Sequence, residues 1–116
     1  FDRAYVTYSD RAKEQMLGVL HDDLLKHGAV SEEIASQMAV GAKEHSKVAV
    51  TVAATGIAGP GGGMPGKPVG LVHFGWCVGD QPVSCDSEVF AGDRESVRQQ
   101  TVVHALEGII RRMEAS

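Results

Sequence analysis

Residues 48–63 read Val48-Ala-Val-Thr-Val-Ala-Ala-Thr55-Gly-Ile-Ala-Gly-Pro-Gly-Gly-Gly63. The run Val48–Ala54 is nearly all apolar and rich in valine, which predicts a strand covered on both faces of a sheet. Gly56–Gly70 follows and holds seven of the chain's fourteen glycines and three of its four prolines. A buried strand that ends in a long glycine-rich loop is typical of α/β domains, whose ligands bind beyond the carboxyl ends of strands.

The loop can hold an anion, because glycines let backbone N–H groups turn toward a phosphate or a developing oxyanion. Thr55 adds a hydroxyl and Lys67 a positive charge. The loop has neither the Walker A pattern nor the Gly-x-Gly-x-x-Gly pattern. The alternative is a flexible connection without a ligand, but about fifteen residues without secondary structure favour a functional loop.

Downstream, Leu71–Val78 predicts a strand and Val83–Phe90 a more polar edge strand. A hairpin closed by residues 79–82 would place Val78 opposite Val83 and Trp76 opposite Cys85. Cys77 and Cys85 would then lie on opposite faces of the sheet, as reduced structural cysteines, although a register slip of one residue would reverse that geometry.

Upstream, Ala4–Tyr8 is β-branched and aromatic, which predicts a short strand. Capping residues and glycines then predict four helices. They run from Ser9 or Asp10 to Leu17, from His21 to Lys26, from Ser31 to about His45 with Ile34, Met38, Gly41 and Ala42 buried, and onward from Asp93. On the last helix Val97, Thr101, Ala105 and Ile109 form an apolar stripe that Val102, Leu106 and Ile110 widen.

This order of elements predicts a layered α/β/α domain with a mixed sheet, and residues 1–116 are long enough for one domain. The composition, 43% hydrophobic and 22% charged, is that of a globular protein. A net charge of −4 without a long basic run argues against nucleic acid or an anionic membrane as partner. The sequence has no apolar stretch of membrane-spanning length and no signal peptide, so we expect a cytoplasmic protein.

Several polar residues could carry chemistry. Lys13 could act as a general base if burial lowered its pKa, with Tyr8 as a proton relay, although most helix lysines are solvated. His73 and Cys77 could form a metal pair, but two ligands are too few for a closed zinc site, so we expect no metal. Arg94 and Arg98 begin the last helix, which suits either an anion site or a capped surface helix.

Four segments together resemble the CinA C-terminal domain family, whose characterised members are nicotinamide-nucleotide amidases. They are Val6-Thr-Tyr-Ser-Asp-Arg-Ala-Lys13, His27-Gly-Ala-Val-Ser-Glu32, Thr55–Gly63 with Lys67-Pro-Val-Gly70, and Gly92-Asp-Arg94 with Val97-Arg98. They stand in the family's order and extend over essentially the whole chain, which makes the resemblance specific.

The resemblance implies an amidohydrolase that converts nicotinamide mononucleotide to nicotinic acid mononucleotide and ammonia by a Ser-Lys mechanism, without a cofactor. Lys13 matches the family's base and Tyr8 its assisting tyrosine. Substrate-binding residues would be those of the loop: Thr55, Gly56, Ile57, Ala58, Gly59 and Lys67.

One departure matters. The family's nucleophilic serine lies upstream of its Val-Thr-Tyr segment, in an Ala-Glu-Ser-x-Gly-Gly motif that this sequence lacks. Ser9 and Ser31 belong to other family segments. We therefore expect an N-terminally incomplete amidase domain that is inactive alone. The alternative is an inactive nucleotide-binding or assembly module of the same family. Exposed apolar sheet surface should also favour a homo-oligomer.

Overall fold

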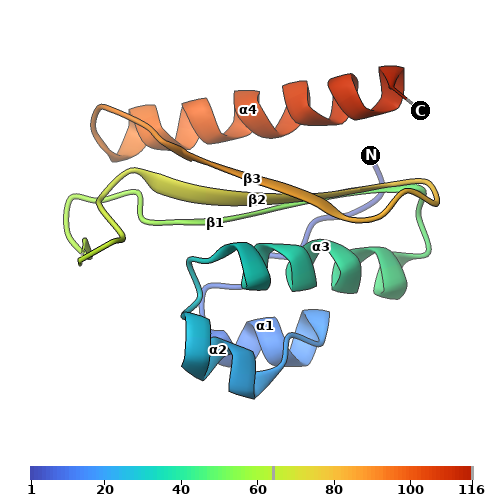
Figure 1. Ribbon diagram of the computed structural model, residues 1–116, viewed down its shortest axis with the longest axis horizontal. Helices are drawn as coiled ribbons and strands as arrows, with labels where there is room; N and C mark the ends of the chain where they lie inside the picture. Colours follow the sequence, from blue (N-terminus) through green and yellow to red (C-terminus); the bar gives the residue numbers. More distant parts are fainter. Residues whose placement is uncertain (64, 116) are drawn as a thin grey trace.

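The computed structural model describes residues 1–63 and 65–115. A sheet lies in the middle, with α4 on one face, α3 on the other, and α1 and α2 beyond α3 (Figure 1). The layered α/β architecture predicted from the sequence is therefore confirmed. The elements are α1 (Asp10–Leu17), α2 (His21–His27), α3 (Glu32–Ser46), β1 (Val50–Gly56), β2 (Leu71–Val78), β3 (Ser84–Val89) and α4 (Arg94–Glu114). No helix among the described residues combines the length and hydropathy that a bilayer-spanning segment needs.

Helices α1, α3 and α4 begin at the capping residues that the sequence indicated. Ser9 Oγ accepts a hydrogen bond from the Ala12 N–H at 3.0 Å and starts α1. Ser31 Oγ accepts from the Ile34 N–H at 3.3 Å to start α3. Asp93 caps α4 in the same way, since its carboxylate accepts from the Ser96 N–H at 2.9 Å. Each cap satisfies a backbone donor that a helix start leaves unpaired.

The sheet has the order β1-β2-β3, and both pairings are antiparallel. The parallel pairing that a mixed sheet requires is absent from residues 1–63 and 65–115. The strand predicted at Val48–Ala54 forms at Val50–Gly56, at the edge of the described sheet. It is not covered on both faces, because Ala54 and Gly56 are exposed. The described elements around β1 therefore leave part of this apolar strand uncovered.

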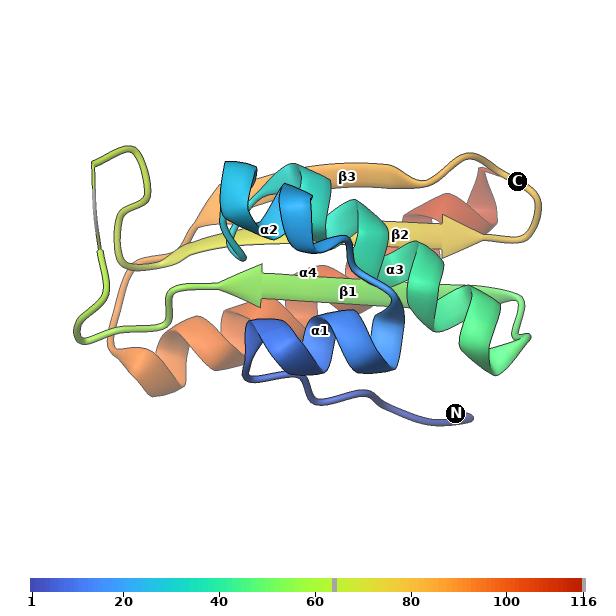
Figure 2. The ribbon, with the colours of Figure 1, turned by 90° about the horizontal axis from the view of Figure 1, so that it is seen from below.

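The strand predicted at Ala4–Tyr8 does not form, and the first regular element is α1. Residues 1–8 instead run as irregular chain alongside the layer of α1 (Figure 2). Two hydrogen bonds link this segment to the helices. Tyr5 Oη lies 2.9 Å from Ser46 Oγ, and Lys13 Nζ donates to Thr7 O at 2.7 Å. A strand exists only when another strand satisfies its backbone, and no such neighbour adjoins these residues in the described chain.

The predicted hairpin register was wrong by one residue. Trp76 pairs with Ser84, and Gly75 pairs with Cys85. The connection between β2 and β3 has five residues, 79–83, since Val83 lies outside β3. Within it the Gln81 N–H donates to Val78 O at 3.1 Å. Cys77 and Cys85 consequently share the α3 face of the sheet, and both are free thiols. Burial raises the pKa of the Cys85 thiol.

The α3 face carries the better-buried core. Ile34, Ala35 and Ala39 are each 0% exposed. Gly75 of β2 lets α3 approach the sheet closely, since a Cβ atom there would lie 2.6 Å from Ala35 O. The other side of α3 packs against α1 and α2 and buries Leu17, Val19 and Leu24. Helix α3 is thus covered on two sides.

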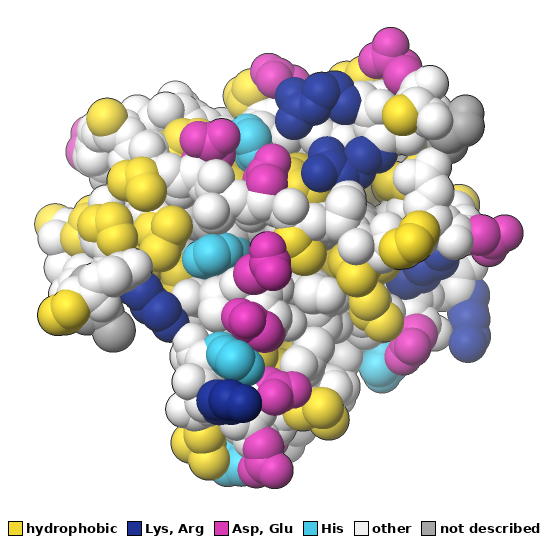
Figure 3. Space-filling model, in the orientation of Figure 1, with side chains coloured by type: hydrophobic (Ala, Val, Ile, Leu, Met, Phe, Trp, Pro, Cys, Tyr) yellow, Lys and Arg dark blue, Asp and Glu magenta, His cyan; other side chains and the backbone are white. Residues whose placement is uncertain are grey.

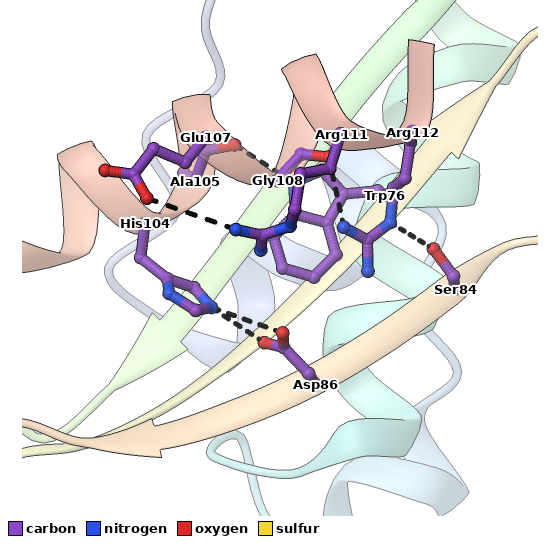
Figure 4. A network of polar contacts seen from close by, with 9 residues as sticks. All are labelled: Trp76, Ser84, Asp86, His104, Ala105, Glu107, Gly108, Arg111 and Arg112. Atoms are coloured by element: carbon purple, nitrogen blue, oxygen red, sulfur yellow. Dashed lines mark hydrogen bonds and ion pairs between the residues drawn. The ribbon is translucent and has the colours of Figure 1, made fainter. Parts of the chain in front are cut away.

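The α4 face is built on two stacked rings, Phe74 and Trp76, whose centroids are 5.5 Å apart. Trp76 Nε1–H donates to Ala105 O at 3.0 Å, and the Arg112 guanidinium lies 3.7 Å from the ring centroid. His104 Nε2 contacts both Asp86 oxygens, at 3.0 and 3.2 Å, and so joins α4 to β3 (Figure 4).

The predicted apolar stripe of α4 is only partly buried. Val97 is 1% exposed, whereas Val102, Leu106 and Ile110 are 57%, 54% and 56% exposed. The three residues expected to widen the stripe therefore stay more than half exposed, because no described element covers them. Their exposure is a correction to the sequence-based expectation.

Candidate active site

The glycine-rich loop leaves the carboxyl end of β1 and returns to β2 beside its own start. Two backbone bonds close its base: Ile57 N–H donates to Leu71 O at 2.9 Å, and Gly70 N–H donates to Ile57 O at 2.6 Å. Gly70 has φ 94°, and a Cβ atom there would lie 2.2 Å from Phe90 O. Only glycine fits that position. The base of the loop is thus tightly built, while Gly61–Gly63 at its tip are exposed.

Three side-chain bonds anchor the loop to its surroundings. Thr55 Oγ1 donates to Ala29 O at 2.8 Å. Lys67 Nζ donates to His27 O at 2.6 Å, and basic side-chain atoms are visible where the loop meets α2 (Figure 3). Arg94 Nη1, in the first turn of α4, donates to Gly59 O at 3.0 Å. The loop therefore lies between the α2–α3 connection and the N-terminus of α4.

The predicted loop residues have different surroundings. Thr55 is 7% exposed, and its hydroxyl proton is already donated to Ala29 O, so it acts first as an anchor. Gly56 is exposed, Ile57 and Ala58 are half-buried, and Gly59 is buried. The exposed backbone after Thr55 is the part that a ligand can approach. Lys67 and Arg94 bring two positive charges to the two sides of the loop, which suits a phosphate group.

His73 belongs to this region, although the sequence indicated it only as half of a doubtful metal pair. It lies opposite Thr55 in the β1–β2 register. Burial lowers the pKa of its imidazole. Glu32 and Glu33 oppose that shift, whereas the Lys67 charge adds to it. Among the described residues no group of three or more His, Cys, Asp or Glu side chains is arranged to hold a metal ion.

Lys13 is a buried lysine with a lowered pKa. Its side chain is 6% exposed, and Nζ donates to Thr7 O at 2.7 Å. Burial lowers the pKa of Lys13, and the nearby carboxylate of Asp10 opposes part of that shift. A lysine with a lowered pKa has a larger neutral fraction, which can accept a proton. No contact recorded within residues 1–63 and 65–115 joins Lys13 to the loop.

Tyr8 and Lys13 lie in different environments. It is 91% exposed, on the irregular segment before α1. Lys13 instead bonds the carbonyl of the neighbouring residue, Thr7. The structure therefore places Lys13 in a buried position and Tyr8 in an open one.

The two serines near these residues are occupied as helix caps. Ser9 Oγ accepts from Ala12 N–H, and Ser31 Oγ both accepts from Ile34 N–H and donates to Gly28 O at 2.8 Å. A nucleophile needs a hydroxyl aimed at the substrate and an adjacent base. Neither Ser9 nor Ser31 has that arrangement.

One side chain and two backbone carbonyls connect the parts of this site. Arg94 was ambiguous between an anion site and a surface helix, and its bond to Gly59 O joins it to the loop. The carbonyls of His27 and Ala29 carry no side-chain signal at all, yet they receive Lys67 and Thr55. Backbone acceptors of this kind are visible only in the folded chain.

The CinA C-terminal domain matches residues 1–113. The nicotinamide-nucleotide amidohydrolase PncC of Enterobacter agglomerans is 45% identical over 111 residues, which cover 96% of this chain and 68% of that protein. The protein of the same name from Escherichia coli (strain K12) is 44% identical over 107 residues, 92% of this chain and 65% of that protein.

Among solved structures, the competence/damage inducible protein CihA from Agrobacterium tumefaciens has a TM-score of 0.89 and 44% identity, over 92% of this chain and 66% of that chain. This chain thus spans about two thirds of the length of each of these three proteins. Its sequence and its fold lead to the same assignment: the chain belongs to the CinA C-terminal domain family.

Proposed function

We propose that this chain carries the general base and the substrate-holding loop of a nicotinamide-nucleotide amidase, while the nucleophile comes from outside these 116 residues. The observation that carries the proposal is Lys13, a lysine 6% exposed with a lowered pKa at the start of α1. Burying an ammonium costs free energy, so a fold that keeps one needs a reason. The names of the relatives, nicotinamide-nucleotide amidohydrolases, give the substrate class.

The chemistry would proceed in two balanced steps. A serine Oγ attacks the carboxamide carbonyl of nicotinamide mononucleotide, and neutral Lys13 takes the serine proton. The proton passes to the departing amide nitrogen, which leaves as ammonia, and an ester of the serine remains. Water then cleaves the ester, giving nicotinic acid mononucleotide and the free serine. The loop N–H groups after Thr55 would hold either the phosphate or the oxyanion.

Binding and turnover should separate in this chain. Calorimetric titration with nicotinamide mononucleotide tests binding, and ammonia release tests turnover. We expect saturable binding without ammonia release. The variants Lys67→Met and Thr55→Val should weaken binding about tenfold, since each removes a buried or charge-assisted hydrogen bond that anchors the loop.

A matched control for the lysine variant is Lys26→Met, which removes the same charge from an exposed position on α2. It should leave the affinity unchanged. Equal losses in Lys67→Met and Lys26→Met would mean that only the net charge matters and would contradict the loop site. Ammonia release by the unmodified chain at the rate of a longer relative would contradict the assignment of the nucleophile.

A second candidate is a nucleotide-binding or assembly module that never turns over substrate. The helix-capping bonds of Ser9 and Ser31 favour it, because they leave neither hydroxyl placed as a nucleophile. The Lys13→Met variant distinguishes the two. If the chain is part of an amidase, the variant should stop ammonia release in the presence of a polypeptide that supplies the nucleophile. If the chain is only a binding module, the variant should keep its nucleotide affinity.

A further inference from the structure

A pocket of about 410 Å³ lies where α4 meets the end of β3. Its lining residues are Phe90, Gln99, Gln100, Val103, His104 and Glu107. The five from α4 recur at three- and four-residue intervals, so they share one face of the helix. Leu106 and Ile109 instead line the space beside β1, so the pocket lies on the other flank of α4. Its volume is within the range of small-molecule sites.

His104 is the polar centre of this pocket. Its side chain is 17% exposed, and its Nε2 lies 3.0 and 3.2 Å from the two Asp86 oxygens (Figure 4). The ring centroid is 4.5 Å from that of Phe74 and 6.0 Å from that of Phe90. These contacts fix the orientation of the ring. Nε2–H donates to the carboxylate, and Nδ1 remains for another partner.

The Nδ1 atom of His104 opens to solvent at the pocket. No residue in 1–63 or 65–115 forms a hydrogen bond with it. Among those same residues, no buried side-chain nitrogen or oxygen lacks a hydrogen-bond partner, so an unbonded Nδ1 has to be accessible. In the neutral ring this nitrogen is a hydrogen-bond acceptor.

Gln100 supplies a second acceptor. Its Nε2 donates to Ala91 O at 2.8 Å, to Ser96 O at 3.2 Å and to Ser96 Oγ at 3.1 Å. These bonds occupy the amide nitrogen and fix the side chain, which leaves Oε1 to accept from a ligand.

Glu107 adds a carboxylate to the same wall. Its side chain is 59% exposed, and Arg111 Nη1 lies 4.0 Å from Oε2, beyond hydrogen-bond distance. Phe90 and Val103 supply apolar surface. The pocket therefore combines an apolar wall with several acceptors and a negative charge. The chemistry that complements it is an apolar ring bearing a positively charged donor.

We propose that this pocket binds a small arylalkylamine, with its ring against Phe90 and Val103 and its ammonium group donating to Glu107, Gln100 and His104. An anionic ligand of the same size would meet the Glu107 carboxylate instead. The lining residues include no Ser, Thr, Cys or Lys, so the pocket suits binding rather than covalent chemistry. The inference does not rest on the amidase proposal, because the pocket and the glycine-rich loop share no residue.

The test compares two ligands with the same ring, phenethylamine and phenylacetate, added to this chain and followed by NMR. We expect phenethylamine to bind saturably with millimolar affinity, as is typical of a ligand this small. Amide shifts should concentrate at Phe90 and at residues 99–107. Phenylacetate should bind at least about tenfold more weakly, because its charge has the wrong sign.

A first pair of variants locates the ligand. Val103→Lys places a positive charge in the pocket and should weaken phenethylamine about tenfold or more. Val102→Lys is the matched control, because it makes the same change next to it on α4 without touching the pocket. Val103 and Val102 are 53% and 57% exposed, so both variants should fold.

A second pair tests the carboxylate. Glu107→Gln keeps the shape of the side chain and should weaken phenethylamine about fivefold, since a charge-assisted hydrogen bond is lost. Glu114→Gln removes the same charge from an exposed position at the end of α4 that does not line the pocket. It should leave the affinity unchanged.

Four results would overturn the proposal. Phenethylamine could fail to bind saturably, or phenylacetate could bind equally well. Equal losses within either pair of variants would mean that only the net charge of the chain matters. Competition between phenethylamine and nicotinamide mononucleotide, with shifts at residues 55–70, would place the amine at the loop instead.

Discussion

The two faces of the sheet carry helices of similar apolar content with different outcomes. Helix α3 buries Ile34, Ala35 and Ala39 completely and is covered on its other side by α1 and α2. Helix α4, with 21 residues, leaves Leu106 and Ile110 more than half exposed. An apolar stripe tells which residues prefer burial. Whether they achieve it depends on the next layer, and α4 has none in the described chain.

The difference can be sharpened by truncating one large side chain on each helix. Ile34→Ala should reduce the free energy of unfolding by about 2–5 kcal/mol, since it empties a fully buried site. Leu106→Ala should change it by less than about 0.5 kcal/mol, because an exposed side chain loses little packing. Urea denaturation measures both. Similar costs for the two variants would mean that Leu106 is buried in solution by something beyond this chain.

Glycine substitutions test the closeness of each helix to the sheet. A Cβ atom at Gly75 would lie 2.6 Å from Ala35 O, and one at Gly108 would lie 2.3 Å from Trp76 Cζ2. Gly75→Ala forces α3 backbone to move and should cost about 1–3 kcal/mol. Gly108→Ala also clashes, but the helix propensity of alanine returns about 1 kcal/mol, so its net cost should be smaller.

Thermal unfolding of both glycine variants checks this order. A larger loss for Gly108→Ala than for Gly75→Ala would show that Trp76 cannot yield, and that α4 is held more rigidly than its exposed stripe suggests. The corresponding serine variants should follow the same order, because the clash begins at Cβ.

The smallest expected effect is a pH dependence on the α3 face. Burial lowers the pKa of His73, so the folded chain keeps it neutral where the unfolded chain binds a proton. Stability should therefore fall as the pH drops below the ordinary histidine pKa of about 6.5. His73→Gln removes this contribution. Urea midpoints between about pH 7.5 and pH 5 should decline less steeply in the variant than in the unmodified chain.

Much of the fold could be predicted because its signals are local. Ser9, Ser31 and Asp93 start helices through side-chain bonds to residues three positions away, and such bonds depend on little else. The strand at residues 4–8 and the two-sided burial of β1 could not be predicted correctly, because pairing depends on a distant neighbour. The hairpin register was lost to a single extra residue in the turn.

The candidate site also has features that local sequence signals predict and features that depend on distant parts of the chain. Glycine content pointed to the loop, and the loop is anchored as a defined structure by Thr55, Lys67 and Arg94. The sequence could propose Lys13 as a base only conditionally, since its pKa depends on burial. The acceptors of the anchoring bonds are carbonyls of His27, Ala29 and Gly59, and every residue type has a carbonyl. Their roles come from the fold alone.

Trp76 is the only tryptophan of the chain, and its contacts make it a reporter for one face of the sheet. Its ring is 1% exposed, bonds to Ala105 O through Nε1–H, and lies under the Arg112 guanidinium. Fluorescence emission should shift to longer wavelength when α4 leaves the sheet and the indole meets water. Circular dichroism follows all four helices at once. Recording both signals during heating would tell whether α4 detaches before α3 melts.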